Sequence, residues 1–419
     1  MRRTPLDGWA EQICGSMPME EWQLARLRET LALAKKSGFY TRHLQDAGQV
    51  RTLKDLQRLP FTTAGDIIRE GMQMLCVPPG DISRIVTLRT SGTTDAPKRI
   101  YFTEHDIGLT ARFFAGGLPT VTPAGSTMAV MMPCKTPDGV GDLICRGLSR
   151  ASIIPVPYGP LVRFADAAHM LVESGARAAV GFPVQILALA RYLAMKGVKT
   201  KLRSVLLSGD NVPEAAVRAL EEYGIQVYRH LGMTETGLGF AIDCDAHEGM
   251  HIREPDLLVE IADPATGQSL PDGERGEIVV TTLTRCGMPL IRYRTGDYSR
   301  ILPGRCRCGS MLRRLDDVRG RVSGELCLKG RMLMMHELDE VLFCLPQIMD
   351  FCAAGGKEGL LVRIAAFEGT GLSEDRVRAA LMEIPAIRDA SGLRIEISIG
   401  HYREFLPLHE GKRKFYLGM

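Results

Sequence analysis

The sequence predicts an α/β protein with a large N-terminal domain of helix-flanked, mostly parallel sheets, a β subdomain and a small α+β C-terminal domain. Three observations predict this fold. The chain starts with a helical stretch, continues with short β-rich runs that alternate with helical runs, and then shifts to antiparallel strands and turns. With 419 residues, 45% of them hydrophobic, it can bury a large core in two or three structural units.

The first part of the chain is expected to be helical. Apolar residues recur at helical spacing between residues 20 and 58, with a stop at Ser37-Gly38 and a second short helix near Leu53 to Leu59. We therefore assign residues 1–83 to a helical segment that opens the large N-terminal domain, residues 1–320.

The middle of the chain, residues 84–243, is expected to form an α/β core. Strands are expected at Arg84–Leu88, Thr127–Met132, Ser152–Val156, Ala178–Gly181, Ser204–Leu207 and Gln226–Tyr228, with helices such as Phe164–Glu173 and Pro213–Tyr223 between them. This alternation favours a mostly parallel sheet covered by helices.

Antiparallel strands and a small last domain are expected after residue 243. The β subdomain, 244–320, should contain strands at Leu257–Ile261, Glu277–Thr282 and near Tyr298–Leu302, with a turn at residues 263–267. The C-terminal domain, 321–419, should contain strands Leu360–Ala366 and Leu393–Ile399 and a helix Ser373–Met382 capped by Ser373. Its small size suits a mobile domain.

Composition excludes several classes of protein. Lys and Arg number 52 against 49 Asp and Glu, and this net charge of +3 is far below that of a dedicated nucleic-acid binder. The sequence contains no signal-peptide core and no window of about 18 uncharged apolar residues. Eleven unevenly spaced cysteines are typical of reduced thiols. We therefore expect a cytoplasmic protein with neither nucleic-acid nor membrane partners, and leave a homodimer open.

A polar loop that ends in a lysine gives the first chemical signal. The run from Thr90 to Lys98 follows an expected strand, and its hydroxyls, main-chain N–H groups and lysine could wrap a polyphosphate. A polar hairpin loop is the alternative. The run resembles the Ser-Gly-Thr-Thr-Gly-x-Pro-Lys phosphate loop of the adenylate-forming superfamily, with Asp95 in place of a glycine. By this resemblance, the nucleotide-binding residues are Ser91, Gly92, Thr93, Thr94 and Lys98.

Two further motifs occur in the order expected of this superfamily. Ser208-Gly209-Asp210 follows the expected strand Ser204–Leu207 and resembles the loop that frames adenine, although a capped turn would explain it if it stood alone. The run Leu231 to Thr236 is similar to the Tyr-Gly-x-Thr-Glu signature. The resemblance implies nucleotide contacts for Gly232, Met233 and Thr234 and a Mg²⁺ ligand in Glu235, with a helix start as the alternative.

The run from Thr281 to Asp297 is the most specific. The sequence of this run is Thr-Thr-Leu-Thr-Arg, followed by Pro-Leu-Ile-Arg-Tyr-Arg-Thr-Gly-Asp. It resembles phenylacetate–CoA ligases more closely than other branches of the superfamily. The resemblance implies that Asp297 holds both ribose hydroxyls, because a carboxylate can accept two hydrogen bonds at once.

Two motifs near the C-terminus complete the resemblance. Gly320-Arg321-Val322-Ser323-Gly324 stands where the family has its hinge, so Arg321 corresponds to an arginine that contacts the nucleotide, while Ser323 replaces an acidic residue. Glu410-Gly411-Lys412 is similar to the family's last signature and gives Lys412 the role of the adenylation lysine. A solvent-exposed basic tail is the alternative.

The same branch suggests a structural metal site. Cys306 and Cys308 stand one residue apart at a glycine turn, and Cys244 and His251 lie upstream. Three thiols and one imidazole make a Cys₃His set for tetrahedral Zn²⁺. We prefer His251 to His247 because its Gly-Met-His-Ile context matches the family's Gly-Leu-His-Ile. Reduced structural cysteines are an equally weighted alternative.

Together the motifs predict an AMP-forming acid–CoA ligase that uses ATP, Mg²⁺ and coenzyme A. Thr234, Glu235 and Lys412 are the catalytic candidates, since attack of a carboxylate on the α-phosphate creates charge that must be neutralised. Cys134, Lys135 and Phe182 are expected in the acyl pocket, because they follow predicted strands at the carboxyl edge of the sheet. The polar members of this set favour a more polar acid than phenylacetate.

Two other functions are compatible with the sequence. An adenylyltransferase would stop at the acyl-AMP or transfer AMP to a coenzyme, and Ser323 in the hinge favours it slightly. A non-catalytic nucleotide-binding relative is suggested by Asp95 and Ser323, but the chain retains the other signature residues. Product formation that depends on coenzyme A distinguishes these functions from the ligase.

Overall fold

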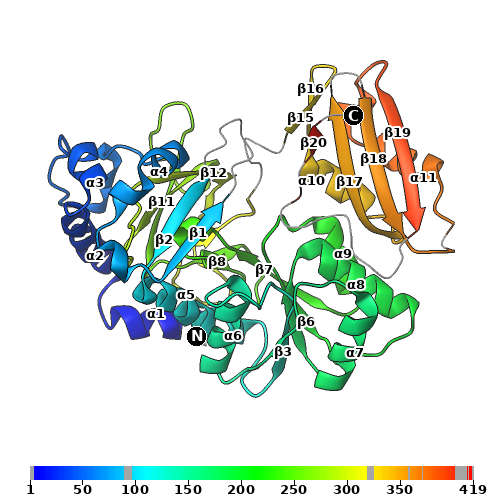
Figure 1. Ribbon diagram of the computed structural model, residues 1–419, viewed down its shortest axis with the longest axis horizontal. Helices are drawn as coiled ribbons and strands as arrows, with labels where there is room; N and C mark the ends of the chain where they lie inside the picture. The colour runs from blue at the N-terminus through cyan, green and yellow to red at the C-terminus, as the bar shows by residue number, and fades with distance from the viewer. Residues whose placement is uncertain are drawn as a thin grey trace. The chain divides into compact units, whose positions relative to one another are not determined.

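The computed structural model describes residues 4–88, 97–318, 325–356, 359–369, 371–401, 413 and 415–417. The described residues group into two compact units, and each unit combines stretches that are distant in sequence. Unit 1 comprises Met1–Pro123, Arg146–Ser152 and His230–Arg319, and unit 2 comprises Ala124–Cys145, Ile153–Arg229 and Gly320–Met419. Figure 1 shows the helices and strands of both units and labels many of them.

Helices form the first part of unit 1. They are α1 (Pro5–Cys14), α2 (Met19–Ala34), α3 (Gly38–His43), α4 (Ala64–Glu70) and the 3-10 helices η1 (Leu53–Arg58), η2 (Gly71–Met74) and η3 (Pro79–Asp81). Threonine side chains cap α1 and α4 in capping boxes that involve Asp7 and Asp66. Ser37, where we expected a helix to stop, also starts the next one, because its hydroxyl accepts a hydrogen bond from Tyr40 N at 3.2 Å.

A hairpin and a long helix follow in unit 1. β1 (Arg84–Leu88) pairs with β2 (Lys98–Phe102), and α5 (Glu104–Gly117) and η4 (Leu118–Thr120) come next. Arg84–Leu88, which we expected as the first strand of the mostly parallel α/β core, instead pairs antiparallel with β2 and lies outside the parallel sheet. The physical reason is the short connection, since parallel neighbours need a crossover of a dozen or more residues.

Antiparallel strands fill the rest of unit 1. One sheet has the order β10 (Leu257–Ala262), β11 (Gly276–Thr282), β12 (Tyr293–Ser299). In the other, β8 (Ala241–Ile242), β9 (Met250–Ile252), β14 (Arg314–Leu315) and β13 (Ile301–Leu302) continue from the end of β7. The strand expected near Tyr298–Leu302 is therefore split between β12 and β13. The predicted turn at residues 263–267 is present, with Asp263 accepting hydrogen bonds from the main chain of Ala265 and Thr266.

Unit 2 contains a parallel sheet, as the sequence predicts. Its order is β4 (Ile154–Pro157), β3 (Thr127–Val130), β5 (Ala178–Gly181), β6 (Ser204–Leu207), β7 (Gln226–Leu231), and its helices are α7 (Phe164–Ser174), α8 (Pro183–Met195) and α9 (Glu214–Glu222). Helix α6 (Val140–Arg150) follows β3. Adjacent strands pair in parallel throughout this sheet. The α/β fold class is thus confirmed.

The C-terminal part of unit 2 is a smaller α+β region, here called the C-terminal segment (residues 325–417). It contains β15 (Glu325–Leu328), β16 (Arg331–Met334), α10 (Met335–Leu342), β17 (Ile348–Gly356), β18 (Gly359–Ala366), α11 (Glu374–Leu381), α12 (Pro385–Arg388), β19 (Arg394–His401) and β20 (Tyr416–Leu417). Its main sheet has the order β19, β18, β17, β20. The predicted capping of α11 is present, with Ser373 Oγ accepting from Arg376 N at 3.3 Å.

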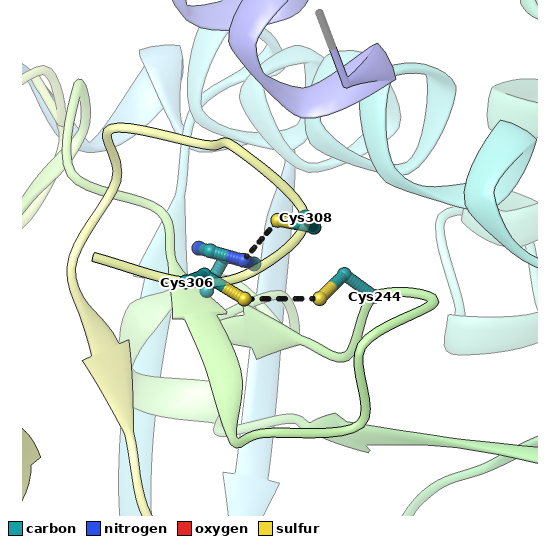
Figure 2. A group of neighbouring side chains, drawn as sticks. Cys244, Cys306 and Cys308 are labelled. Carbon is teal, nitrogen blue, oxygen red and sulfur yellow. Dashed lines mark hydrogen bonds between the residues drawn. The ribbon is translucent and has the colours of Figure 1, made fainter. Parts of the chain in front are cut away.

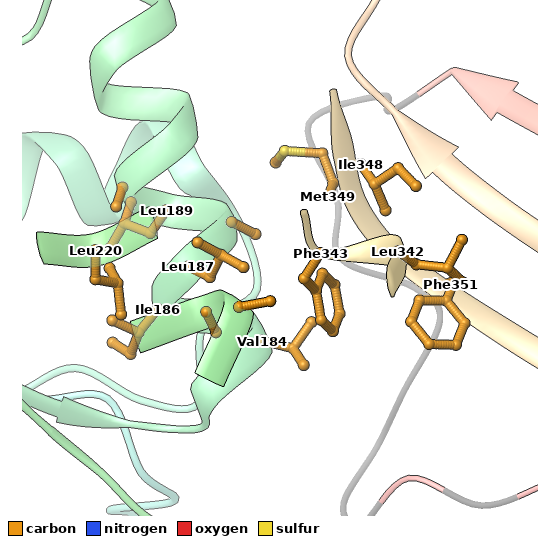
Figure 3. Packing of buried hydrophobic residues seen from close by; sticks show 14 of the residues in the cluster. Val184, Ile186, Leu187, Leu189, Leu220, Leu342, Phe343, Ile348, Met349 and Phe351 are labelled. Carbon is orange, nitrogen blue, oxygen red and sulfur yellow. The ribbon is translucent and has the colours of Figure 1, made fainter. Parts of the chain in front are cut away.

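One buried apolar cluster joins the C-terminal segment to the helices of the parallel sheet. Figure 3 shows Val184, Leu187 and Leu220 of α8 and α9 in the same cluster as Phe343 and Ile348. Compact unit 2 therefore includes both regions, and the sequence-based division into domains at residues 320 and 321 stays a prediction. Within the described ranges, the chain has no helix with the length and apolar character needed to span a membrane.

Candidate active site

A largely buried ion pair joins two of the predicted nucleotide motifs in unit 1. Lys98 begins β2, Glu235 lies in the 3-10 helix η5 (Thr234–Thr236), and the side chains form a salt bridge although they are 137 residues apart. The Tyr293 hydroxyl lies 3.2 Å from Lys98 Nζ and 3.3 Å from Glu235 Oε1. The lysine predicted to bind phosphate and the carboxylate predicted to bind Mg²⁺ are thus adjacent.

Tyr293 was not among the residues that sequence reasoning selected. It lies inside the specific run that ends at Asp297, between two arginines, so an aromatic residue in that motif was the available signal. Only 1% of its surface is exposed, and its hydroxyl therefore needs partners inside the protein. Lys98 and Glu235 are such partners.

Arg285 fixes the main chain on both sides of this ion pair. Its Nη1 donates to the carbonyl oxygen of Glu235 at 2.6 Å, and its Nη2 donates to that of Tyr101 at 2.7 Å. The guanidinium carbon lies 4.4 Å from the ring centroid of Phe102. Burial lowers the pKa of Arg285. The run Thr281 to Arg285 thus supports the Thr-Glu motif, a role that sequence reasoning did not assign.

Asp106 holds the turn that follows Arg285. One carboxylate oxygen accepts from Cys286 N at 2.8 Å, and the other accepts from Gly287 N at 3.1 Å. The same carboxylate closes the capping box of α5 with Thr103. The start of α5 and the connection between β11 and β12 are therefore tied together beside the motif residues.

The other predicted residues of unit 1 flank this cluster. Gly232 and Met233 precede η5, and a Cβ atom on Gly232 would lie 2.6 Å from the carbonyl oxygen of Leu238, so the chain turns back tightly here. Thr234 opens η5. Asp297 lies on β12, the strand that Tyr293 begins, and is 5% exposed.

The Ser208-Gly209-Asp210 loop lies in unit 2, directly after β6. Gly209 has φ of 87°, and an added Cβ atom would lie 2.6 Å from the Phe182 ring. Both the positive φ and the short contact with Phe182 exclude a side chain at this position. The predicted adenine loop therefore packs against Phe182, a predicted acyl-pocket residue that directly precedes α8.

The other two predicted pocket residues follow β3 in unit 2. The Cys134 thiol lies 3.0 Å from the carbonyl oxygen of Met132, and a hydrogen bond from the Cys145 side chain lowers the pKa of Cys134 to about 7. Lys135 is exposed. Several other predicted residues lie outside the described part of the chain, namely Ser91, Gly92, Thr93, Thr94, Arg321 and Lys412.

The predicted metal ligands come together in unit 1 (Figure 2). Cys244 follows β8, His251 lies on β9, and Cys306 and Cys308 lie between β13 and β14. The Sγ atoms of Cys244 and Cys306 are 3.6 Å apart, and Cys308 Sγ is 3.3 Å from His251 Nε2. All ligand atoms of the set lie within 4.8 Å of one another. A tetrahedral zinc site with Zn–S bonds of 2.3 Å needs a spacing of about 3.7 Å.

The chemistry of this set also fits a zinc ion. His251 Nδ1 lies 2.9 Å from the carbonyl oxygen of Leu312, which leaves Nε2 for a metal. Burial lowers the pKa of His251 and therefore favours the neutral imidazole that metals bind. Burial also raises the pKa of the Cys244 and Cys308 thiols. A bound cation would reverse that effect, because coordinated thiols lose their protons.

Comparison with known proteins gives one family and a consistent group of relatives. The model of the AMP-binding enzyme family matches residues 48–284. A phenylacetate–coenzyme A ligase of Thermus thermophilus is 28% identical over 407 residues, which cover 90% of this chain and 89% of the relative. One of Escherichia coli is 28% identical over 335 residues, which cover 77% and 75%.

Solved structures with the same fold span nearly the whole chain. A 2-hydroxyisobutyryl-CoA ligase in the postadenylation state, in complex with 2-HIB-AMP, gives a TM-score of 0.80 at 19% identity and covers 95% of this chain and 89% of that one. The same ligase with 2-HIB-AMP and CoA in the thioesterification state gives a TM-score of 0.67 at 21% identity, with 96% and 91% covered. At these identities the likeness shows the fold.

Proposed function

The chain belongs to the family of AMP-binding enzymes, and we propose that it is an acid–CoA ligase that activates a carboxylic acid with ATP and then forms the coenzyme A thioester. The observation that carries this proposal is the largely buried Lys98–Glu235 pair beside Tyr293. The similarity to phenylacetate–coenzyme A ligases over most of both chains supports the same function.

The ion pair suits a site that receives ATP with Mg²⁺. Lysine offers a point charge for phosphate oxygens, and glutamate offers the hard oxygen ligand that Mg²⁺ prefers. Without ligand, the two charges neutralise each other inside the protein, which limits the cost of burying them. ATP and Mg²⁺ would give each a new partner of opposite charge, so we assign Lys98 to the phosphates and Glu235 to the metal. The bound Mg²⁺ would supply positive charge at the phosphates.

The remaining roles concern the nucleotide and the transition state. Asp297 would accept hydrogen bonds from both ribose hydroxyls, and Ser208, Gly209 and Asp210 would border the adenine. Thr234 would donate a hydrogen bond from its hydroxyl to the α-phosphate while the substrate carboxylate attacks the phosphorus atom. Lys412 would stabilise the charge that develops in this step, and thioester formation would not need it. Arg321 would contact the nucleotide beside the hinge.

We also propose an acyl pocket that includes Phe182, Cys134 and Lys135. The contact between Phe182 and Gly209 supports this assignment, because it joins a pocket residue to the nucleotide loop. The thiol and amine of the other two residues favour an acid that carries a polar group. Separately, we propose that Cys244, His251, Cys306 and Cys308 bind a structural Zn²⁺, since protein atoms would fill every position of its tetrahedron.

The function is tested by measuring pyrophosphate release with ATP, Mg²⁺ and a panel of aryl, short-chain and amino acids, with and without coenzyme A. An acid–CoA ligase should give a CoA thioester and AMP with at least one acid. Transfer of AMP without any dependence on coenzyme A would instead show an adenylyltransferase. If no acid in a broad panel causes pyrophosphate release, the ligase proposal fails.

A further inference from the structure

A carboxylate of the C-terminal segment caps a helix of the parallel-sheet region. Glu340 on α10 accepts hydrogen bonds from the main-chain N–H groups of Glu214, at 2.6 Å, and Ala215, at 3.0 Å. These are the first residues of α9, and the first N–H groups of a helix have no partner within the helix. The negative charge of Glu340 also suits the positive end of the helix dipole. Glu340, about 125 positions away in the sequence, thus caps the N-terminus of α9.

Arg191 makes the reciprocal contact. It lies on α8, is 3% exposed, and donates to the carbonyl oxygens of Phe343, at 2.5 Å, and of Ile348. These carbonyls lie just after α10 and at the start of β17. A buried guanidinium with two carbonyl acceptors requires one particular placement of the segment on α8, because its donors form a rigid fork.

The end of the chain reaches the predicted adenine loop in this same arrangement. Arg413 N donates to Asp210 Oδ2 at 3.0 Å. The Arg413 guanidinium lies 2.7 Å from Asp339 Oδ1 and 4.0 Å from the ring centroid of Phe351, both in the C-terminal segment. Arg413 therefore contacts both the rest of the C-terminal segment and the predicted adenine loop. It directly follows Lys412 in the sequence.

We propose that Glu340 and Arg191 are positioning residues, which hold the C-terminal segment on α8 and α9 in the arrangement used for adenylation. This inference rests on the proposed function, in which Lys412 acts only in the first half-reaction. Because thioester formation would not need Lys412, release of these contacts would let the segment move away from the site before that step. Weakening them should therefore lower the population of the adenylation arrangement.

The test compares Glu340→Ala with Glu337→Ala, a substitution on the same helix. Glu337 closes a capping box within the C-terminal segment, accepting from Met334 N at 2.8 Å, and makes a matched control for the loss of a helix cap. Adenylation is measured as pyrophosphate release in a single turnover with ATP, Mg²⁺ and the acid that gives the fastest pyrophosphate release in the substrate panel. Thioester formation is measured separately from the supplied acyl-AMP of that acid and coenzyme A.

In Glu340→Ala, adenylation should slow by about fivefold while thioester formation keeps or exceeds its original rate, because a charge-assisted cap is lost from one arrangement only. Glu337→Ala should affect both half-reactions alike. A conservative variant, Arg191→Lys, keeps the charge but can reach fewer carbonyls, and should show the same selective loss. Equal slowing of both half-reactions in Glu340→Ala, or no slowing of either, would overturn the proposal.

Hydrogen exchange supplies a readout that does not depend on catalysis. The amides of Glu214 and Ala215 should exchange faster in Glu340→Ala than in the unmodified protein and in Glu337→Ala, since Glu340 is their partner. Unchanged exchange would show that the contact does not hold the segment and would overturn the proposal. If the unmodified protein released no pyrophosphate with any acid, the proposed function would fail, whereas exchange would still decide whether the segment is held.

Discussion

The predicted metal ligands and the Lys98–Glu235 ion pair, both in unit 1, are held together in different ways. In the first group, Cys244 Sγ lies 3.6 Å from Cys306 Sγ and Cys308 Sγ lies 3.3 Å from His251 Nε2, so a metal ion would supply the attraction that holds all four side chains together. In the second, the two charges attract each other directly, and the Tyr293 hydroxyl contacts both. Loss of the first group should therefore lower the stability of the fold, whereas changes at the predicted nucleotide residues should act mainly on the reaction.

The largest expected effect is on stability, at the metal cluster. Purified protein should contain about one zinc per chain, and Cys306→Ser/Cys308→Ser should lose it together with about 4 kcal/mol or more of unfolding free energy. Activity per folded molecule should change little, because the ion has no open coordination position. Zinc should also dissociate as the pH falls, since the ligating thiols must be deprotonated and burial raises the pKa of Cys244.

Elemental analysis and thermal unfolding measure both quantities. A Cys327→Ser/Cys344→Ser protein is the matched control, because both thiols are exposed and lie outside the cluster. The zinc proposal would fail if zinc persisted unchanged in the cluster variant or was absent from protein purified without chelator. The four residues would then be reduced cysteines and a histidine that bind no metal.

The opposite pattern is expected at the nucleotide site. Lys412→Ala should slow adenylation by about 100-fold to 1000-fold, which corresponds to about 2.7–4 kcal/mol of transition-state stabilisation. The melting temperature, ATP binding and thioester formation from supplied acyl-AMP should stay close to those of the unmodified protein. Single-turnover assays of each half-reaction provide the measurement. Equal losses in both half-reactions would remove Lys412 from its assigned role.

Asp297→Ala should act on nucleotide binding. Loss of the acceptor for both ribose hydroxyls should weaken ATP binding by about 2 kcal/mol, because it leaves donors unpaired in the complex. Calorimetric titration with ATP measures this. Asp263→Ala, in an exposed turn of the same antiparallel region, serves as a control and should bind ATP normally. An unchanged affinity in Asp297→Ala would exclude the ribose contact.

The parallel core could be predicted from the sequence because its strands are short, apolar and separated by helices. Ala178–Gly181 and Ser204–Leu207 have the predicted bounds. Arg84–Leu88 also has its predicted bounds, but its antiparallel pairing with β2 could not be predicted, because a run of residues does not specify the direction of its neighbour. The split between β12 and β13 was missed for a similar reason, since it follows from pairing with strands far away in the sequence.

Only those residues of the candidate site that belong to recognisable sequence motifs could be selected from the sequence. The four predicted metal ligands lie together in the structure, and so do Lys98 and Glu235, which were selected from separate motifs; their roles stay predictions. Each of these residues belongs to a short recognisable run. The supporting residues Arg285 and Asp106 bond to main-chain atoms, and such contacts leave little trace in a sequence pattern. The contacts of Glu340 and Arg191 join distant parts of the chain and were equally hidden.

The smallest expected effect distinguishes a tyrosine beside the Lys98–Glu235 pair from another buried tyrosine of unit 1. Tyr293→Phe removes a hydroxyl that contacts both Lys98 and Glu235, but keeps the buried ring. Tyr40→Phe is the matched control, because that buried hydroxyl donates to Pro289 O at 3.1 Å and accepts from Ile291 N at 3.2 Å, away from the ion pair.

Each variant should lose about 1 kcal/mol of unfolding free energy, the usual net contribution of a buried hydrogen bond. Only Tyr293→Phe should also slow pyrophosphate release, by about fivefold, since its hydroxyl helps to orient the lysine and the glutamate that receive ATP and Mg²⁺. Denaturant unfolding and single-turnover adenylation on both proteins measure the two effects. If both variants slowed adenylation equally, the Tyr293 hydroxyl would contribute stability alone, and the ion pair would have to be oriented by Arg285 and its main-chain contacts.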